Sequence, residues 1–111
     1  MEVKTRQLKH ADLVQVSGRI DSATAPRLEA ALQEIMAQGR FHIVVDMQNL
    51  EYLSSAGLRV LVAALKQAHR WNRGDVRLAN VSPRVKEVLR LAGLDTLFRI
   101  FDNTVDAVGS F

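Results

Sequence analysis

The amino-acid sequence predicts a single α/β domain with a mixed, mostly parallel sheet of four or five strands and about four helices. Segments typical of strands alternate with segments typical of helices, which favours parallel strands joined by right-handed crossovers. The first two strand segments are close enough to form an antiparallel hairpin. The length of 111 residues suits one domain with one hydrophobic core, so we expect a single domain over residues 1–111.

The first third of the chain is predicted to contain two strands and a helix. Glu2–Leu8 alternates weakly and Leu13–Val16 is β-rich, which is typical of two strands joined by a turn. Gly18 is expected to break the second strand. Thr24–Pro26 offers a hydroxyl cap and a first-turn proline, so it predicts a helix start, and Gly39 is expected to end that helix.

A buried strand and a long helix are predicted in the middle of the chain. Phe41–Val45 is almost continuously apolar, as in strands covered on both faces, and Asp46 is expected to end it. Helical spacing of apolar residues then predicts a helix over Ala56–Trp71 with the inner face Leu58, Leu61, Val62, Leu65 and Ala68. The residues expected on its other faces are Arg59, Val60 and Ala63.

The last third continues the alternation of strands and helices. The expected elements are a turn at Asn72–Asp75, a strand at Val76–Ala79, a helix from Ser82 to Gly93, a short strand at Leu97–Phe101 and a helix capped by Asp102 or Asn103.

Composition excludes several classes of protein. The chain has no cysteine, which rules out disulfides and thiolate metal sites and favours a reducing compartment. No signal-peptide pattern opens it, and its apolar runs are far shorter than the ~20 residues of a membrane span, so we expect a cytoplasmic protein.

The net charge is +3, with basic residues at Lys66, Arg70, Arg73 and Arg77. Without interleaved aromatics these predict a solvated face or an acidic protein partner, not direct nucleic-acid binding.

Motifs of common enzymes are absent from the sequence. There is no phosphate-binding loop, dinucleotide fingerprint or complete nucleophile elbow, because Leu53 replaces the first glycine of G-x-S-x-G. The three histidines have no metal-ligand spacing. Ser55 and His69 would lie ~20 Å apart on one helix, too far for a triad with Asp46. We therefore expect no catalytic residue, metal or cofactor, and no enzymatic activity.

Ser54 and Ser55 lie between the buried strand and the long helix. A serine at this position caps the first turn by accepting an amide hydrogen bond. The free N–H groups and the positive end of the helix dipole would also tolerate a phosphate there. Such a phosphate would change the surface charge without unfolding the domain.

Three motifs resemble the STAS domain, in particular the small bacterial anti-sigma-factor antagonists. The first is VVDMQNLEYLSSAGLRVLV (residues 44–62), with Ser-Ala-Gly-Leu opening a helix. The second is the Gly-Arg-Ile-Asp of Gly18–Asp21, and the third is LANVSPRVKEVLRLAGL (residues 78–94). The resemblance covers essentially the whole chain. One position departs from the family pattern, since Ser54 stands where the family commonly has aspartate.

The resemblance implies a partner switch in transcription regulation. The unphosphorylated protein would bind an anti-sigma factor that is also a serine kinase and release the sigma factor. Phosphorylation of Ser55, with Ser54 as second choice, would weaken the complex, and a serine/threonine phosphatase would reverse it. The expected partner-binding residues are Asp21, Ser54, Ser55, Ala56, Gly57, Arg59, Val60 and Ala63. The alternative is a non-phosphorylated STAS adaptor subunit of a transporter or signalling assembly.

Overall fold

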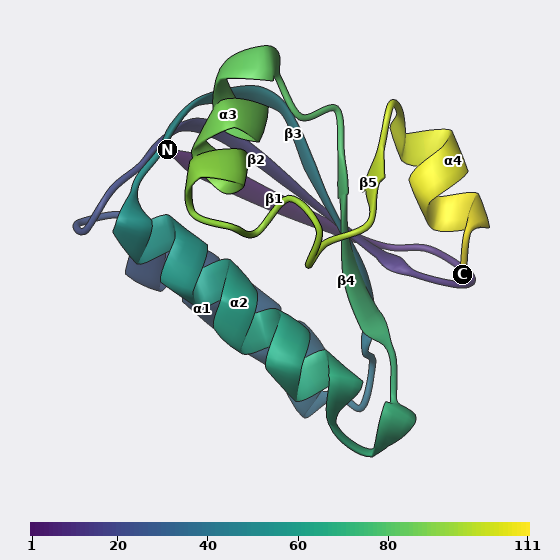
Figure 1. Cartoon of the computed structure of the whole chain (residues 1–111). Helices are drawn as coiled ribbons and strands as arrows, with labels where there is room; N and C mark the ends of the chain where they lie inside the picture. The colour runs from purple at the N-terminus through teal and green to yellow at the C-terminus, as the bar shows by residue number, and fades with distance from the viewer.

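Five strands form one sheet in the computed structural model, which describes residues 1–111 (Figure 1). They are β1 (Glu2–Gln7), β2 (Asp12–Ile20), β3 (His42–Leu53), β4 (Asp75–Ala79) and β5 (Ile100–Phe101), in the spatial order β1-β2-β3-β4-β5. The β1–β2 pair is antiparallel and the other pairs are parallel. The predicted fold class, a mixed and mostly parallel α/β sheet, is confirmed.

Helices cover the two faces of the sheet unequally. They are α1 (Ala25–Ala37), α2 (Ser55–His69), α3 (Pro83–Leu91) and α4 (Thr104–Gly109), with a short 3-10 turn η1 (Arg70–Asn72) after α2. The first three lie on one face, with α1 and α2 side by side, and α4 lies on the other (Figure 1). The larger core of 25 buried residues forms under α1, α2 and α3, and a smaller one of five residues includes Ala107 of α4.

The predicted helix boundaries are largely confirmed by their caps. Ser82 and Asn103 each accept a hydrogen bond from a first-turn amide, at 3.2 and 2.8 Å. Gly39 and Gly93 follow α1 and α3 with φ of +80° and +73°, the left-handed conformation that glycine adopts without strain. The helix expected to reach Trp71 instead ends at His69, because Trp71 itself has a φ of +61°.

Asp46 does not end its strand, contrary to the expectation. β3 continues to Leu53, but β4 pairs with it only as far as Asp46. The buried Asp46 carboxylate accepts hydrogen bonds from the Gln48 amide at 3.1 Å, from Asn80 Nδ2 at 3.0 Å and from Gln15 Nε2 at 3.4 Å. Asp46 therefore binds Asn80, the residue that follows β4, and fixes the position at which the chain leaves the sheet.

β2 also runs further than expected, through Gly18 to Ile20. Gly18 has a φ of +80° and lies at an irregularity in the pairing of β2 with β3. The glycine admits a bulge in the strand and does not terminate it. Both long strands consequently end together, at Ile20 and Leu53, which are paired with each other. None of the helices combines the length and the apolar composition that a membrane span requires.

Candidate functional site

The start of α2 lies beside the loop that follows β2. The Ser54 amide donates a hydrogen bond of 2.9 Å to the Ile20 carbonyl, and Asp21 is the next residue of that loop. The carboxyl ends of β2 and β3 therefore bring the Asp21 loop next to Ser54 and Ser55. These residues belong to two motifs that are distant in the sequence, and the pairing of β2 with β3 brings them together.

The two serines have different environments. Ser54 is the N-cap of α2: its backbone is extended and its Oγ accepts the Gly57 amide hydrogen bond at 3.3 Å. Ser55 is the first residue of the helix, is exposed, and makes no side-chain hydrogen bond within the chain. The cap function therefore falls to Ser54, which leaves the Ser55 hydroxyl free to react or to bind.

Asp21 is held by its own loop. Its Oδ1 accepts hydrogen bonds from the amides of Thr24 and Ala23, both at 3.0 Å. The pKa of Asp21 lies below its ordinary value, chiefly because the Thr24 amide donates a hydrogen bond to the carboxylate. The other donors of the loop and the nearby charge of Arg19 lower it further. The carboxylate thus stays ionised beside the start of α2.

The expected hydroxyl cap at Thr24 is not formed. Thr24 precedes α1, but its Oγ1 donates to the Arg19 carbonyl at 2.9 Å and accepts from the Asp21 amide, also at 2.9 Å. The hydroxyl therefore closes the turn between β2 and α1 and leaves the helix without a side-chain cap.

Gly57 packs tightly against the ends of β2 and β3. It is buried, and a methyl group built on it would come within 2.6 Å of Leu53 Cδ1 and 2.7 Å of Ile20 Cγ2. The first turn of α2 thus rests directly on the ends of β2 and β3. Gly57 therefore offers no exposed side-chain surface, and its contact with a partner stays a prediction.

The expectation that Val60 points away from the core is wrong. Its exposed fraction is 9%, and it packs in the larger core, because α2 is covered by α1 as well as by the sheet. The buried stripe of α2 confirms Leu58, Leu61, Leu65 and Ala68 of the predicted inner face, omits Val62, and adds Gly57, Val60 and Ala64. Of the residues predicted for a partner, Ser55, Arg59 and Ala63 are exposed, and Asp21, Ser54 and Ala56 are half-buried.

A groove runs along the outer side of α2, beginning at Ser55. We call it the α2 groove; its volume is about 490 Å³ and its lining is Ser55, Leu58, Arg59, Val62, Ala63 and Lys66 of α2 with Ala92 and Leu94 from the segment after α3. No carboxylate lines it, and neither Arg59 nor Lys66 makes an ion pair. Sequence reasoning missed Ala92 and Leu94, since only the fold brings them to α2.

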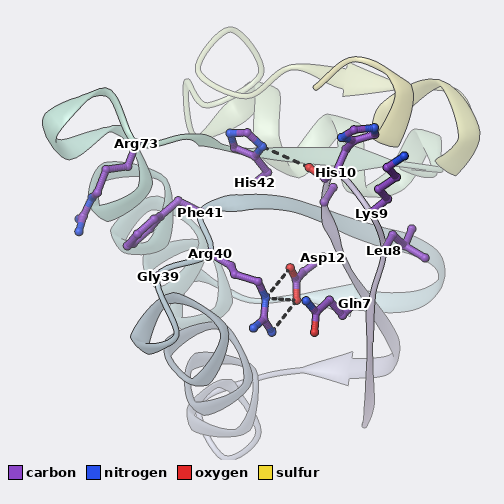
Figure 2. A pocket seen from close by; sticks show the side chains of 11 residues that line it. Gln7, Leu8, Lys9, His10, Asp12, Gly39, Arg40, Phe41, His42 and Arg73 are labelled. Carbon is purple, nitrogen blue, oxygen red and sulfur yellow. Dashed lines mark hydrogen bonds and ion pairs between the residues drawn. The ribbon is translucent and has the colours of Figure 1, made fainter.

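The opposite end of the sheet has a second hollow, of about 310 Å³, lined by more cationic groups (Figure 2). Figure 2 shows that these groups do not converge: Arg40 turns to Asp12, Lys9 and His10 lie on the turn between β1 and β2, and Arg73 points away from them. The Arg40 guanidinium meets the buried Asp12 carboxylate through three contacts of 3.0 to 3.2 Å. This cluster therefore fixes the fold and does not form a site.

The basic residues that follow one another in the sequence separate in the structure. Lys66 lines the α2 groove, whereas Arg73 bonds the carbonyls of Arg70 and Gln67 and so ties down the turn after α2. Arg77 pairs with Asp75 at 2.9 Å.

The histidines do not approach Ser55. His69 lies at the far end of α2 and contacts Asp75 at 2.7 Å, so the distance along the helix excludes a triad with Ser55. No three histidine, aspartate or glutamate side chains gather in a cluster that could hold a metal ion.

Comparison with known proteins agrees with this architecture. The family model described as the STAS domain matches residues 2–107. The anti-sigma-F factor antagonist RsfB of Mycobacterium tuberculosis is 33% identical over 97 residues, covering 86% of this chain and 77% of RsfB. The anti-sigma-B factor antagonist of Listeria monocytogenes is 30% identical over 100 residues, covering 90% of this chain and 86% of its own.

A solved structure extends the likeness to the fold. The crystal structure of an anti-sigma factor antagonist from Mycobacterium paratuberculosis has a TM-score of 0.88 and 28% identity, and the match covers 98% of this chain and 92% of that one. The sheet order, the position of α2 and the matched residues 2–107 lead to one conclusion: the chain belongs to the STAS domain family.

Proposed function

We propose that this protein is an anti-sigma-factor antagonist that works by partner switching. Its unphosphorylated form binds an anti-sigma factor that is also a serine kinase, and the sigma factor is thereby released. Phosphorylation of Ser55 weakens the complex, and a serine/threonine phosphatase restores it. The role of this chain is binding, and the chemistry of phosphorylation belongs to its partners.

The observation that carries the proposal is the free hydroxyl of Ser55 at the exposed start of α2. Ser54 is engaged as the cap, so modification of Ser54 would have to rearrange its hydrogen bond with the Gly57 amide, whereas Ser55 has no bond to rearrange. The names of the relatives support the same function, because both are anti-sigma factor antagonists at 30% identity or more over most of the chain.

A phosphate on Ser55 would act on binding and not on folding. It adds nearly two negative charges at the first turn of α2, where the helix dipole and free N–H groups favour an anion. The fold therefore accepts the group, while a partner that covers Ser55 must desolvate it. We assign the partner surface to the exposed or half-exposed residues around it: Asp21, Ser54, Ser55, Ala56, Arg59 and Ala63.

The test uses four proteins: wild type, Ser55→Ala, Ser55→Asp and Ser54→Ala. Each is incubated with radiolabelled ATP and a purified kinase-type anti-sigma factor encoded in the same genome, and binding is measured by calorimetry. We expect Ser54→Ala to be labelled and Ser55→Ala to remain unlabelled but bind normally. We expect Ser55→Asp to bind at least about tenfold more weakly, since one added charge in an interface costs about 1.4 kcal/mol or more.

Two results would overturn the proposal. Label on Ser55→Ala but not on Ser54→Ala would move the phosphorylation site to Ser54. Equal affinity of Ser55→Asp and wild type for the anti-sigma factor, with no phosphate in the intact mass of the protein from cells, would favour the non-phosphorylated adaptor.

A further inference from the structure

We propose that the α2 groove binds an acidic, apolar segment of the partner, with Arg59 and Lys66 receiving its carboxylates. The identity of that partner, an anti-sigma factor, rests on the proposed function. The chemistry of the occupant does not, because it is argued from the residues that line the groove.

The shape of the groove suits a peptide segment. Its α2 residues Ser55, Arg59, Val62 and Lys66 follow one another at i, i+4, i+7 and i+11, so they form one stripe along the helix. At ~1.5 Å of rise per residue the stripe is ~16 Å long, about three turns of a helix. Because the lining residues extend along three helical turns, the groove suits an amphipathic peptide segment better than a compact small molecule.

The floor of the groove is apolar. Its residues are Leu58, Val62, Ala63, Ala92 and Leu94, of which Val62 and Leu94 are half-buried and Ala63 is exposed. Covering this surface would remove apolar area from water, which is the main source of affinity for a segment bound in this way. The occupant should therefore present leucine-like side chains toward α2.

The rim of the groove is positively charged and its charges have no internal partners. Arg59 and Lys66 are exposed and make neither an ion pair nor a hydrogen bond, and α2 contains no acidic residue. Arg40, Arg77 and Arg90 are paired within the fold with Asp12, Asp75 and Glu87. Other exposed cations, such as Arg84 on α3, are also unpaired, and what distinguishes Arg59 and Lys66 is their place on the rim of an apolar groove. A segment that carries carboxylates beside its apolar side chains would thus be complementary to both parts of the groove.

The same groove explains how a phosphate on Ser55 would act at this site. Ser55 and Arg59 are one turn apart, the spacing at which opposite charges on a helix attract. A phosphoserine at position 55 would engage Arg59 within the chain and repel an acidic segment at the same end of the groove. The phosphate and the partner segment would therefore compete for one cation.

The first experiment uses a synthetic probe, so that it needs no identified partner. A fluorescent 16-residue helical peptide with leucine and glutamate on one face is titrated with the protein, and a second peptide carries glutamine in place of glutamate. The proteins are wild type, Arg59→Glu, Lys66→Glu and the control Arg84→Glu, whose exposed cation lies on α3 outside the groove.

We expect the acidic peptide to bind wild type more tightly than the glutamine peptide, with an affinity that falls as salt rises. Arg59→Glu and Lys66→Glu should each weaken it about five- to tenfold, and Arg84→Glu should leave it within about twofold. Phosphoserine introduced at position 55 during translation should weaken the acidic peptide but not the glutamine peptide. Equal affinities of wild type for the two peptides, or no change in Arg59→Glu and Lys66→Glu, would overturn the proposal.

A second measurement separates this proposal from the proposed function. The same variants and Ser55→Asp are titrated against the kinase-type anti-sigma factor. If Ser55→Asp weakens that complex but Arg59→Glu and Lys66→Glu do not, the switch stands and the groove proposal fails. If the charge-dependent peptide binding is present but Ser55→Asp binds the anti-sigma factor as wild type does, the groove stands and the switch fails.

Discussion

At the scale of single residues, the two adjacent serines differ in what they contribute to stability. Ser54→Ala should lower the free energy of unfolding by about 1 kcal/mol, because the Gly57 amide loses its cap. Ser55→Ala should change it by less than about 0.5 kcal/mol, since the exposed hydroxyl bonds nothing within the chain. Urea unfolding followed by circular dichroism measures both, and equal losses in the two variants would contradict this division.

Sequence reasoning placed a serine cap at this helix but left open which serine provides it. The answer depends on where the helix begins to within one residue, and the spacing of apolar residues does not resolve that. Thr24 shows the same limit: a hydroxyl before a helix is typical of a cap, yet this one bonds the Arg19 carbonyl instead. Short-range hydrogen-bond choices depend on the turn geometry, which tertiary packing sets.

At the scale of elements, the sequence predicted the type and order of every strand and α-helix, but the ends of β2, β3 and α2 and the buried face of α2 differ from the prediction. β3 was expected to end at Asp46 because the nearly continuous apolar run Phe41–Val45 ceases there. Beyond Asp46 the strand loses β4 as a neighbour and pairs with β2 through a shifted register. Such irregular pairing hides a strand from a pattern of period two. Nothing in the local sequence around Ala92 and Leu94 indicates that these residues line a groove with α2.

The buried face of α2 is wider than predicted: Leu58, Leu61, Leu65 and Ala68 are buried as expected, but Val62 is not and Gly57, Val60 and Ala64 are buried as well. Spacing alone put Val62 inside and Val60 outside, whereas the structure buries Val60 and leaves Val62 half-buried in the groove. A helix that packs on a sheet and on a neighbouring helix buries a wider stripe than one that faces a single surface. The contact of α2 with α1 is a tertiary feature, so the sequence pattern of α2 cannot reveal it.

The close contact of α2 with β2 and β3 makes a prediction for Gly57. Gly57→Ala should lower the free energy of unfolding by about 1–3 kcal/mol, because the new methyl group collides with Leu53 and the branched Ile20. Alanine ordinarily favours a helix over glycine, so intrinsic propensity alone predicts the opposite sign. Gly109→Ala in α4 is the matched control, since nothing lies within 4 Å of its added methyl group. A Gly57→Ala protein as stable as wild type in urea would show that the contact relaxes freely.

At the scale of the whole molecule, the two ends of the parallel strands have separate roles. The carboxyl ends carry the Asp21 loop and Ser55, and the α2 groove begins there and runs along α2 to Lys66. The amino ends carry Asp12, at which β2 begins, and Arg40, which follows α1. Their ion pair joins the start of β2 to the chain that leads into β3. The carboxyl end thus presents the exposed Ser55, while the buried Asp12 carboxylate at the amino end is paired within the fold.

This separation predicts which arginines matter for stability and which for binding. Arg40→Ala should lower the urea midpoint clearly, because it leaves the buried Asp12 carboxylate without its cation. Arg90→Ala removes only an exposed pair with Glu87 and should lower the midpoint little. At urea concentrations below its unfolding transition, Arg40→Ala should still bind the acidic peptide as wild type does. Arg59→Glu should show the reverse, with a normal urea midpoint and weak peptide binding. If Arg40→Ala lost peptide binding while still folded, the two ends would be coupled through the sheet, and the amino-end ion pair would have to be counted as part of the functional site.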